Sequence, residues 1–237
     1  YEAIRQFILE AGKENCLVIH TTLLPYINAA GEMKTKPTQQ AIRMLSEHGI
    51  FPDFIVCRAE KGIDDVRKKK IQVGANVPTD HIISAPDMET VYEIPLVLEK
   101  ENLGAKMLAH LGLEPRKELN WDRWEQLVRR SRQPANQVKV AMVGKYIEIG
   151  EFQLTDSYIS VNESLVHAGV AADTKVDITW IDGHAIEKGD LTSVDLAEFN
   201  GIIVPGAFGS GGSEGVMQAI RFAREQNVPF LGLCYGL

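Results

Sequence analysis

One cysteine near the end of the chain stands in a pattern that could do chemistry. Cys234 lies within Gly232-Leu233-Cys234-Tyr235-Gly236, directly after an apolar run at 229–233. Gly-x-Cys-x-Gly after a strand is the cysteine form of the nucleophile elbow, a sharp turn that needs small residues where backbones crowd. A helix after the turn would direct its positive end at the sulfur and favour the reactive thiolate. A buried cysteine in an ordinary turn between a strand and a helix is the alternative interpretation.

A glycine-rich segment at 204–215 has the same setting between a predicted strand and a predicted helix. Its backbone N–H groups could stabilise an oxyanion, as acyl transfer requires. A plain flexible loop and a phosphate cradle are alternatives, although the sequence lacks the Gly-x-x-x-x-Gly-Lys-Ser/Thr pattern of a Walker A loop. A thiol and amide donors at the ends of neighbouring strands together favour a thiol acyl-transfer site.

A third segment combines positive charge with hydrogen-bonding side chains before a predicted helix. It reads Lys34-Thr35-Lys36-Pro37-Thr38-Gln39. Lysine side chains and a helix N-terminus can bind a polyphosphate together. A solvated loop is the alternative, and the basic run at 67–70 likewise reads as a solvated helix face.

Alternating strands and helices must position these residues. The first half is expected to contain strands at 16–19, 54–57 and 81–84, with helices at 1–12, 38–48 and 64–73. The second half is expected to contain strands at 138–143, 176–180, 201–204 and 229–233, with helices at 157–167 and 215–225. A polar helix at 121–130 and a linker at 130–137 separate them. This alternation predicts an α/β fold with two parallel-sheet, helix-flanked domains of Rossmann-like or flavodoxin-like type, both truncated. The predicted parts are 1–113, a connecting helix and linker at 114–137, and 138–237.

Composition narrows the classes of partner. A net charge of −7 over 237 residues argues against binding to nucleic acid or anionic membrane. No apolar run reaches the roughly 20 residues that cross a bilayer, and no signal-peptide pattern opens the chain. Three cysteines without metal-type spacing fit a reducing compartment, so a cytoplasmic location and no metal site are expected.

The two glycine-containing turns, Pro205-Gly206-Ala207-Phe208-Gly209 and the Cys234 turn, resemble class I glutamine amidotransferases. The resemblance implies that Cys234 attacks the side-chain amide of glutamine and releases ammonia. It also implies an oxyanion hole formed by the backbone at Gly206 and Tyr235, with Ala207 and Phe208 contacting glutamine. The triad His and Glu of that family lie downstream of Leu237, so His167 and His184 are interpreted as surface or packing residues.

The whole chain, from Tyr1 to Leu237, resembles the CTP synthase family. The resemblance is carried, in order, by His20, Pro25-Tyr26, the Lys34 to Gln39 segment, 54–58, Asn76-Val77-Pro78, Val91-Tyr92-Glu93-Ile94-Pro95 and Val143-Gly144-Lys145-Tyr146.

This second resemblance implies an ATP- and Mg²⁺-dependent enzyme of pyrimidine nucleotide biosynthesis. It would phosphorylate O4 of UTP and replace the phosphate with ammonia from glutamine, carried through an internal tunnel, to give CTP. CTP is the implied feedback inhibitor, GTP an implied allosteric effector, and a homotetramer that can form filaments the implied assembly. The implied ligand contacts are Lys34, Thr35, Lys36, Pro37, Thr38, Gln39 and Lys70 for UTP and CTP, and Pro86, Asp87 and Met88 for ATP.

Departures from the family pattern leave two other hypotheses open. The resemblance puts the P-loop lysine and the Mg²⁺ ligands before Tyr1, so this chain alone is expected to be inactive. Ala207 and Gly211 stand where the family has Gly and Arg; a positive φ at Ala207 would cost about 1 kcal/mol, and loss of the Arg would affect the GTP response. A nucleotide-binding, assembly-forming relative with a decayed glutaminase is one alternative. Another kind of glutaminase is the second, although it leaves the Lys34 to Gln39 segment unexplained.

Overall fold

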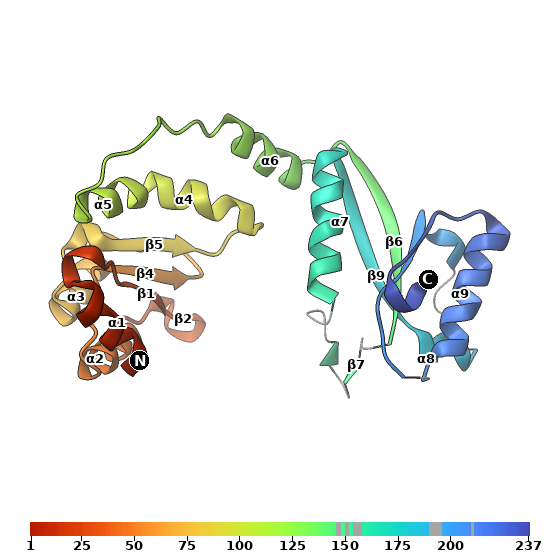
Figure 1. Ribbon diagram of the computed structural model, residues 1–237, viewed down its shortest axis with the longest axis horizontal. Helices are drawn as coiled ribbons and strands as arrows, with labels where there is room; N and C mark the ends of the chain where they lie inside the picture. The colour runs from red at the N-terminus through yellow and green to blue at the C-terminus, as the bar shows by residue number, and fades with distance from the viewer. Residues whose placement is uncertain (146–147, 150–151, 154–157, 190–195, 210) are drawn as a thin grey trace. The chain divides into compact units, whose positions relative to one another are not determined.

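The computed structural model describes residues 1–145, 148–149, 152–153, 158–189, 196–209 and 211–237. The chain divides into two compact units, Tyr1–Glu125 and Gln126–Leu237, shown in Figure 1. Each unit is described by itself below.

The first unit is built on a three-stranded parallel sheet. The strand order is β1-β4-β5, and the register pairs Thr22 with Cys57 and Cys57 with Ser84. The strands are β1 (Ile19–Leu23), β4 (Phe54–Ala59) and β5 (Ile82–Pro86), and a small antiparallel pair joins β2 (Tyr26–Ile27) and β3 (Glu32–Met33). The helices are α1 (Glu2–Ala11), α2 (Lys36–Glu47), α3 (Asp65–Ala75), α4 (Ile94–Lys100) and α5 (Leu103–His110), with 3-10 turns at Lys13–Asn15, Asn28–Ala30, Thr79–His81 and Val91–Glu93.

The core of this unit lies against the central strand. Ile55 and Cys57 of β4 are fully buried and pack with Ile42 of α2 and Ile71 of α3. A central parallel strand covered by helices reads as an apolar run, which is why Phe-Ile-Val-Cys is recognisable in the sequence. Helix α3 begins where the Asp64 carboxylate accepts a hydrogen bond from the backbone N–H of Arg67.

The second unit holds a four-stranded parallel sheet in the order β11-β10-β6-β9. Its strands are β6 (Asn136–Gly144), β9 (Thr174–Asp182), β10 (Gly201–Val204) and β11 (Phe230–Gly232), and a short antiparallel pair joins β7 (Glu148–Ile149) and β8 (Phe152–Gln153). The helices are α7 (Ile159–Ala171), α8 (Gly183–Glu187) and α9 (Ser213–Gln226), with 3-10 turns at Leu196–Glu198 and Cys234–Gly236, while α6 (Asp122–Arg132) spans the boundary between the units.

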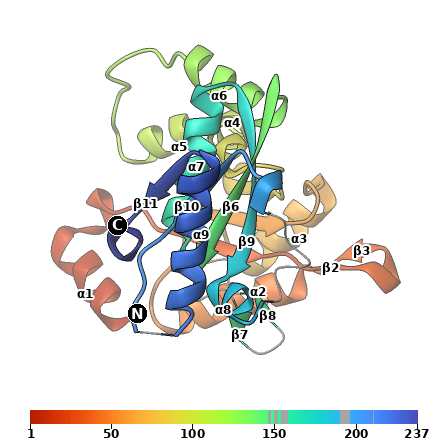
Figure 2. The same cartoon turned by 90° about the vertical axis from the view of Figure 1, so that its right-hand side faces the viewer.

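Helices cover both faces of the second sheet. In Figure 1 the strands β6 and β9 lie between α7 and α9, and in Figure 2 α9 runs in front of β10 and β6. Val216 and Ala219 of α9 are buried against Val143 of β6 and Ile202 of β10. The predicted α/β fold with parallel, helix-flanked sheets is therefore confirmed.

Several predicted boundaries were wrong. The first strand begins at Ile19 rather than at residue 16, because its ladder partner β4 begins at Phe54. The linker predicted at 130–137 is mostly regular structure: α6 continues to Arg132, and β6 begins at Asn136, which pairs with Thr174. The sequence reading also missed α4 and α5. The start of the helix predicted at 157–167 lies outside the described residues.

The predicted domain bounds stay a prediction, although the division between the two units falls inside the 114–137 segment. Among the described residues, no helix is long and apolar enough to cross a membrane.

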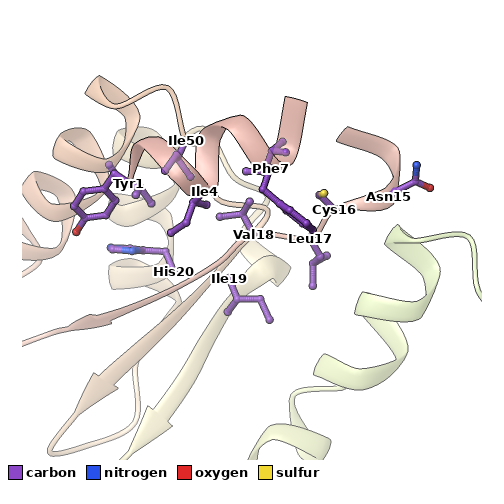
Figure 3. Close-up of a pocket in the computed structure, with 12 residues that line it drawn as sticks. Tyr1, Ile4, Phe7, Asn15, Cys16, Leu17, Val18, Ile19, His20 and Ile50 are labelled. Atoms are coloured by element: carbon purple, nitrogen blue, oxygen red, sulfur yellow. The ribbon is translucent and has the colours of Figure 1, made fainter. Parts of the chain in front are cut away.

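A cavity of about 510 Å³ lies in the first unit between α1 and the chain that leads into β1. Figure 3 shows Ile4 and Phe7 of α1 on one side of it and Val18 and His20 on the other. Burial lowers the pKa of His20, and its Nε2 has no hydrogen-bond partner among the described residues. None of the residues predicted to bind a ligand lines this cavity, so it lies apart from the candidate sites.

Candidate functional site

The chemistry-bearing residues of the second unit follow the carboxyl ends of its strands. Lys145 comes after β6, Gly183 after β9, Gly206 after β10 and Cys234 after β11. These four strands are parallel, so their carboxyl ends meet at one edge of the sheet. Open α/β sheets bind their ligands at that edge.

The backbone at Cys234 has the geometry of a nucleophile elbow. Cys234 has a φ of 55°, a left-handed conformation that is uncommon for a residue with a side chain and that marks local strain. The residue before it is fixed to the neighbouring strand, because the N–H of Leu233 donates to the carbonyl of Val204 over 2.9 Å. The thiol is exposed. This turn therefore presents the sulfur at the edge of the sheet, as the sequence pattern predicted.

Both glycines of the pattern are required by close backbone contacts. A methyl group on Gly232 would lie 2.2 Å from the carbonyl oxygen of Gly236, and one on Gly236 would lie 2.3 Å from that of Val204. Neither neighbour is a flexible side chain that could move away. The Gly-x-Cys-x-Gly spacing is thus a steric requirement of this turn.

The glycine-rich segment approaches the sulfur. A methyl group on Gly206 would lie 3.5 Å from Cβ and 3.9 Å from Sγ of Cys234, so the backbone at Gly206 and the thiol are neighbours. Ala207 is partly buried, and Phe208 is 84% exposed. Of the two predicted oxyanion residues, Gly206 therefore lies beside the candidate nucleophile in space, and Tyr235 follows it in the chain.

The strain considered for Ala207 does not arise. Among the described residues, the non-glycine positions with positive φ are Asn76, Asn102, Asp173, Asn227 and Cys234. Ala207 is not one of them, so an alanine fits its backbone conformation. The left-handed positions of this segment are Gly209, with φ 78°, and Gly212, with φ 69°.

His184 packs on the end of the same segment. A methyl group on Gly211 would lie 2.8 Å from Cε1 of His184, so the imidazole lies directly beside this exposed glycine. Its Nδ1 lies 3.6 Å from the Glu187 carboxylate, and its side chain is half exposed. His167 is exposed on α7. These positions agree with the surface and packing roles expected for the two histidines.

Lys145 is a site residue whose importance the sequence reading missed. Its Nζ donates to the carbonyl of Gly209 over 2.6 Å and to Oγ of Ser213 over 3.0 Å. The same ammonium lies 4.0 Å from the centroid of the Tyr235 ring, and the Tyr235 hydroxyl donates to Ser213 over 2.6 Å. A lysine directly after a strand, on the edge that carries the nucleophile, was the signal that could have indicated it.

The other two cysteines lack the exposure of Cys234. Cys16 and Cys57 are both buried. Burial raises the pKa of the Cys57 thiol to about 12, so this group stays protonated and unreactive. Cys234 is therefore the one cysteine of the chain whose thiol is open to a substrate.

In the first unit, the segment predicted to bind UTP spans the start of α2. Lys36 and Pro37 are exposed at the first turn of the helix, after Thr35 at the N-cap position. Thr38 is fully buried, and its hydroxyl donates to the carbonyl of Leu23 over 2.9 Å. The hydroxyl of Thr38 therefore holds the helix to the end of β1 and does not face solvent.

The structure brings Gln39 and Lys70 together, although 31 residues separate them. The side-chain amide of Gln39 donates to the backbone carbonyl of Lys70 over 2.6 Å. The pKa of Glu32 is lowered chiefly by its hydrogen bond with Lys34, and Arg67 and Lys70 lower it further. Positive charge from α3 and from the Lys34 segment thus meets at the carboxyl edge of the first sheet.

The segment predicted to contact ATP lies at the end of β5 on the same edge. The N–H of Asp87 donates to the carbonyl of Ala59 over 2.8 Å, and Nη2 of Arg58 donates to the Asp87 carboxylate over 2.8 Å. Pro86 ends the strand and its carbonyl also accepts from Arg58. This segment, which continues to Met88, is therefore held beside the ends of β4 and β5.

Fold and site together define the class of the second unit: a parallel α/β domain with a cysteine nucleophile elbow beside a glycine-rich loop. Comparison with known proteins agrees. Residues 153–237 match the family model for class-I glutamine amidotransferase, and residues 1–113 match the model for the CTP synthase N-terminus. The chain belongs to the CTP synthase family.

Individual relatives support this assignment. The CTP synthases of Ruminiclostridium cellulolyticum and Methanocaldococcus jannaschii are 46% and 45% identical to this chain over 236 and 241 residues, covering 100% of it. The chain spans 43% and 44% of the length of these two proteins. The solved glutaminase domain of Trypanosoma brucei CTPS with bound acivicin aligns with 42% of this chain and 37% of its own, at 34% identity and a TM-score of 0.37.

Proposed function

We propose that this chain is part of an enzyme that converts UTP to CTP with ammonia released from glutamine. The observation that carries the proposal is the exposed Cys234 on a left-handed turn beside Gly206, in a chain whose first half matches the CTP synthase N-terminus. A thiol placed in this way is suited to attack an amide carbonyl, because backbone N–H groups on both sides can stabilise the resulting oxyanion.

The glutaminase reaction follows from this geometry. The Cys234 thiolate attacks the side-chain amide carbon of glutamine, and the negative oxygen is stabilised by backbone N–H groups of the Gly206 loop and of Tyr235. The carbon–nitrogen bond then breaks, ammonia leaves with a proton from a general acid, and a γ-glutamyl thioester remains on the sulfur. Water hydrolyses the thioester to glutamate and frees the thiol. The family resemblance assigns the acid–base role to a histidine downstream of Leu237.

The first unit supplies the nucleotide half of the reaction. Lys34, Lys36 and Lys70 would bind the triphosphate of UTP and of the inhibitor CTP, with the N-terminus of α2 adding its dipole. Since the Thr38 hydroxyl is already engaged with Leu23, its role would be to hold the helix start in place.

ATP would lie beside Asp87 and Met88 and supply the phosphoryl group that activates O4 of UTP. Ammonia then adds at C4, and phosphate leaves as CTP forms. Within the described parts of the chain, no group of three acidic, histidine or cysteine side chains could hold a metal ion. Mg²⁺ would be bound through the nucleotide phosphates.

The proposal extends to regulation and assembly. CTP as inhibitor, GTP as effector and a homotetramer able to form filaments follow from the family resemblance, and a cytoplasmic location follows from the sparse cysteines. The net charge of −7 fits small-molecule substrates better than nucleic acid.

A relative with a decayed glutaminase is the second candidate function. The observations that favour this candidate are Ala207 and Gly211, which stand where the family has Gly and Arg. The backbone of Ala207 is compatible with an alanine, which removes the first of these observations. Gly211, beside His184, remains as the observation that favours an altered response to GTP.

Two assays on the full-length enzyme test the proposed function. Cys234→Ala is expected to lower glutamine-dependent CTP formation by about a thousandfold or more, because no other group can form the thioester. CTP formation from added ammonia should stay within about twofold of wild type, since it bypasses the glutaminase. Cys16→Ala, at a buried cysteine, is the matched control and should keep both activities. Wild-type enzyme that uses ammonia but never glutamine would instead support the decayed-site alternative.

A further inference from the structure

We propose that Lys145 is a positioning residue of the glutaminase, whose ammonium ties the glycine-rich loop to the Cys234 turn and thereby sets the oxyanion hole. This inference rests on the proposed function. The donors of the oxyanion hole come from two different loops, the glycine-rich loop and the Cys234 turn. Lys145 would hold these two loops at a fixed separation.

Lys145 is well placed for this role by the topology of the second sheet. It follows β6, which lies next to β10, and the strand order continues to β11. The glycine-rich loop follows β10 and the Cys234 turn follows β11. A side chain leaving the end of β6 can therefore reach over the end of β10, where the loop begins, toward the turn.

The contacts of the ammonium group span three segments. On the loop it binds the carbonyl of Gly209 at 2.6 Å, and at the first residue of α9 it binds Oγ of Ser213 at 3.0 Å. On the turn it lies 4.0 Å from the centroid of the Tyr235 ring, within the range of a cation–π interaction. The loop, the start of α9 and the residue after the nucleophile are thus joined through one charge.

Tyr235 closes this network. Its hydroxyl donates to Ser213 over 2.6 Å, so ring and hydroxyl are both held on the side of Lys145. The pKa of the Tyr235 hydroxyl is lowered, first by Lys145 and then by Ser213. Because Lys145 and Ser213 hold the ring and hydroxyl of Tyr235, they would also restrain its backbone, which carries the N–H of the oxyanion hole.

An oxyanion hole tolerates only small displacements of its hydrogen-bond donors, and the expected effect on the rate follows from this. Its donors must lie about 2.7–3.1 Å from the developing oxygen, and a misplacement of about 1 Å can cost about a hundredfold in rate. The Gly206 backbone lies three residues before Gly209, and the Tyr235 N–H belongs to the residue that Lys145 covers. Removing the ammonium would therefore loosen both donors while leaving the thiol in place.

The experiment compares three substitutions in the full-length enzyme. Lys145→Met keeps the length of the side chain and removes its charge. It is expected to lower kcat for glutamine hydrolysis by about ten- to a hundredfold, with KM for glutamine within about threefold of wild type. Lys145→Arg, which can still donate to Gly209 and stack on Tyr235, should recover kcat to within about fivefold of wild type. Lys139→Met, on the preceding strand β6, is the matched control and should leave kcat unchanged.

Two further readouts separate positioning from a general loss of structure. Alkylation of Cys234 by iodoacetamide should proceed at the wild-type rate in Lys145→Met, because this reaction needs the thiol and no oxyanion hole. CTP formation from ammonia should also be unchanged. The inference is overturned if kcat of Lys145→Met stays within twofold of wild type, or if alkylation or ammonia-dependent synthesis falls by the same factor as kcat. If Cys234→Ala still forms CTP from glutamine, the proposed function fails whatever Lys145 does.

Discussion

At the scale of single residues, backbone conformation and exposure distinguish Cys234, the proposed nucleophile, from Cys57. Cys234 has a left-handed φ of 55° and an exposed side chain, whereas Cys57 is fully buried in the centre of the first sheet. The turn keeps its shape because glycines flank it, and the geometry around Gly236 shows how little room is available. The reactivity of the sulfur therefore depends on residues that carry no functional group.

The steric requirement at Gly236 leads to a test on stability. Gly236→Ala would place a methyl group 2.3 Å from the Val204 carbonyl, and it should lower the free energy of unfolding by about 1–3 kcal/mol through overpacking. Gly201→Ala is the matched control, because its methyl group would make an ordinary contact at 3.6 Å with Pro229. Thermal unfolding of the two variants measures the difference. Equal melting temperatures would show that the turn can relax and that the second glycine is dispensable.

Residue-level sequence patterns predicted part of this site. The spacing of Gly232, Cys234 and Gly236 was enough to predict the turn, because Gly-x-Cys-x-Gly after a strand is itself the pattern of a nucleophile elbow. The role of Lys145 was not predictable in the same way, since its contacts with Gly209 and Tyr235 depend on the order of the strands in the sheet. The φ of Ala207 likewise depends on the path of the loop, which the residue type does not determine.

At the scale of secondary-structure elements, the start of α2 contributes both to the stability of the first unit and to the predicted nucleotide site. Its buried face is fixed by the Thr38 hydroxyl on the Leu23 carbonyl, and its exposed face carries Lys36 and Pro37. The sequence predicted this helix and the lysines before it. It could not show that adjacent residues of one motif face opposite ways, because that depends on how α2 packs against β1.

Because Lys36 is exposed and Thr38 is buried, substitutions at these two positions should have different effects. Lys36→Ala should weaken UTP binding by about three- to tenfold by removing a charge near the triphosphate, with no change in melting temperature. Thr38→Val should lower the free energy of unfolding by about 1–2 kcal/mol, because the Leu23 carbonyl loses its buried donor. Isothermal titration and thermal unfolding of the full-length enzyme measure the two quantities, with Lys117→Ala as a control at an exposed lysine. Unchanged UTP affinity in Lys36→Ala would remove Lys36 from the nucleotide site.

Element boundaries were less predictable than element types. The alternation of strands and helices predicted both parallel sheets, because buried parallel strands leave apolar runs in the sequence. The start of β6 at Asn136 has the polar composition of a linker. Its pairing with Thr174 depends on backbone hydrogen bonds to β9 and leaves no apolar pattern in the sequence. Helices α4 and α5 were missed in a stretch where Asn102, in a left-handed conformation, lies between the C-cap residue of α4 and the first residue of α5.

At the scale of the whole molecule, two parallel-sheet units each carry predicted ligand residues at the carboxyl edge of their strands. The first unit gathers Lys34, Gln39, Lys70 and Asp87 there, and the second gathers Cys234 with its glycine-rich loop. The chain spans 43% of the length of the CTP synthase of Ruminiclostridium cellulolyticum. Under the proposed function, ammonia would connect the two edges, because one unit would release it and the other would consume it.

If Cys234 forms a covalent bond with glutamine, a reactive glutamine analogue should trap its thiol in the full-length enzyme. The diazoketone analogue of glutamine, which alkylates a thiol held in a glutamine site, is incubated with the enzyme, and the peptides are then mapped by mass spectrometry. We predict one adduct, on the peptide that contains Cys234, with the buried Cys16 and Cys57 unmodified and with labelling suppressed by excess glutamine. An adduct on another residue, or labelling of Cys234 that glutamine does not suppress, would contradict the account.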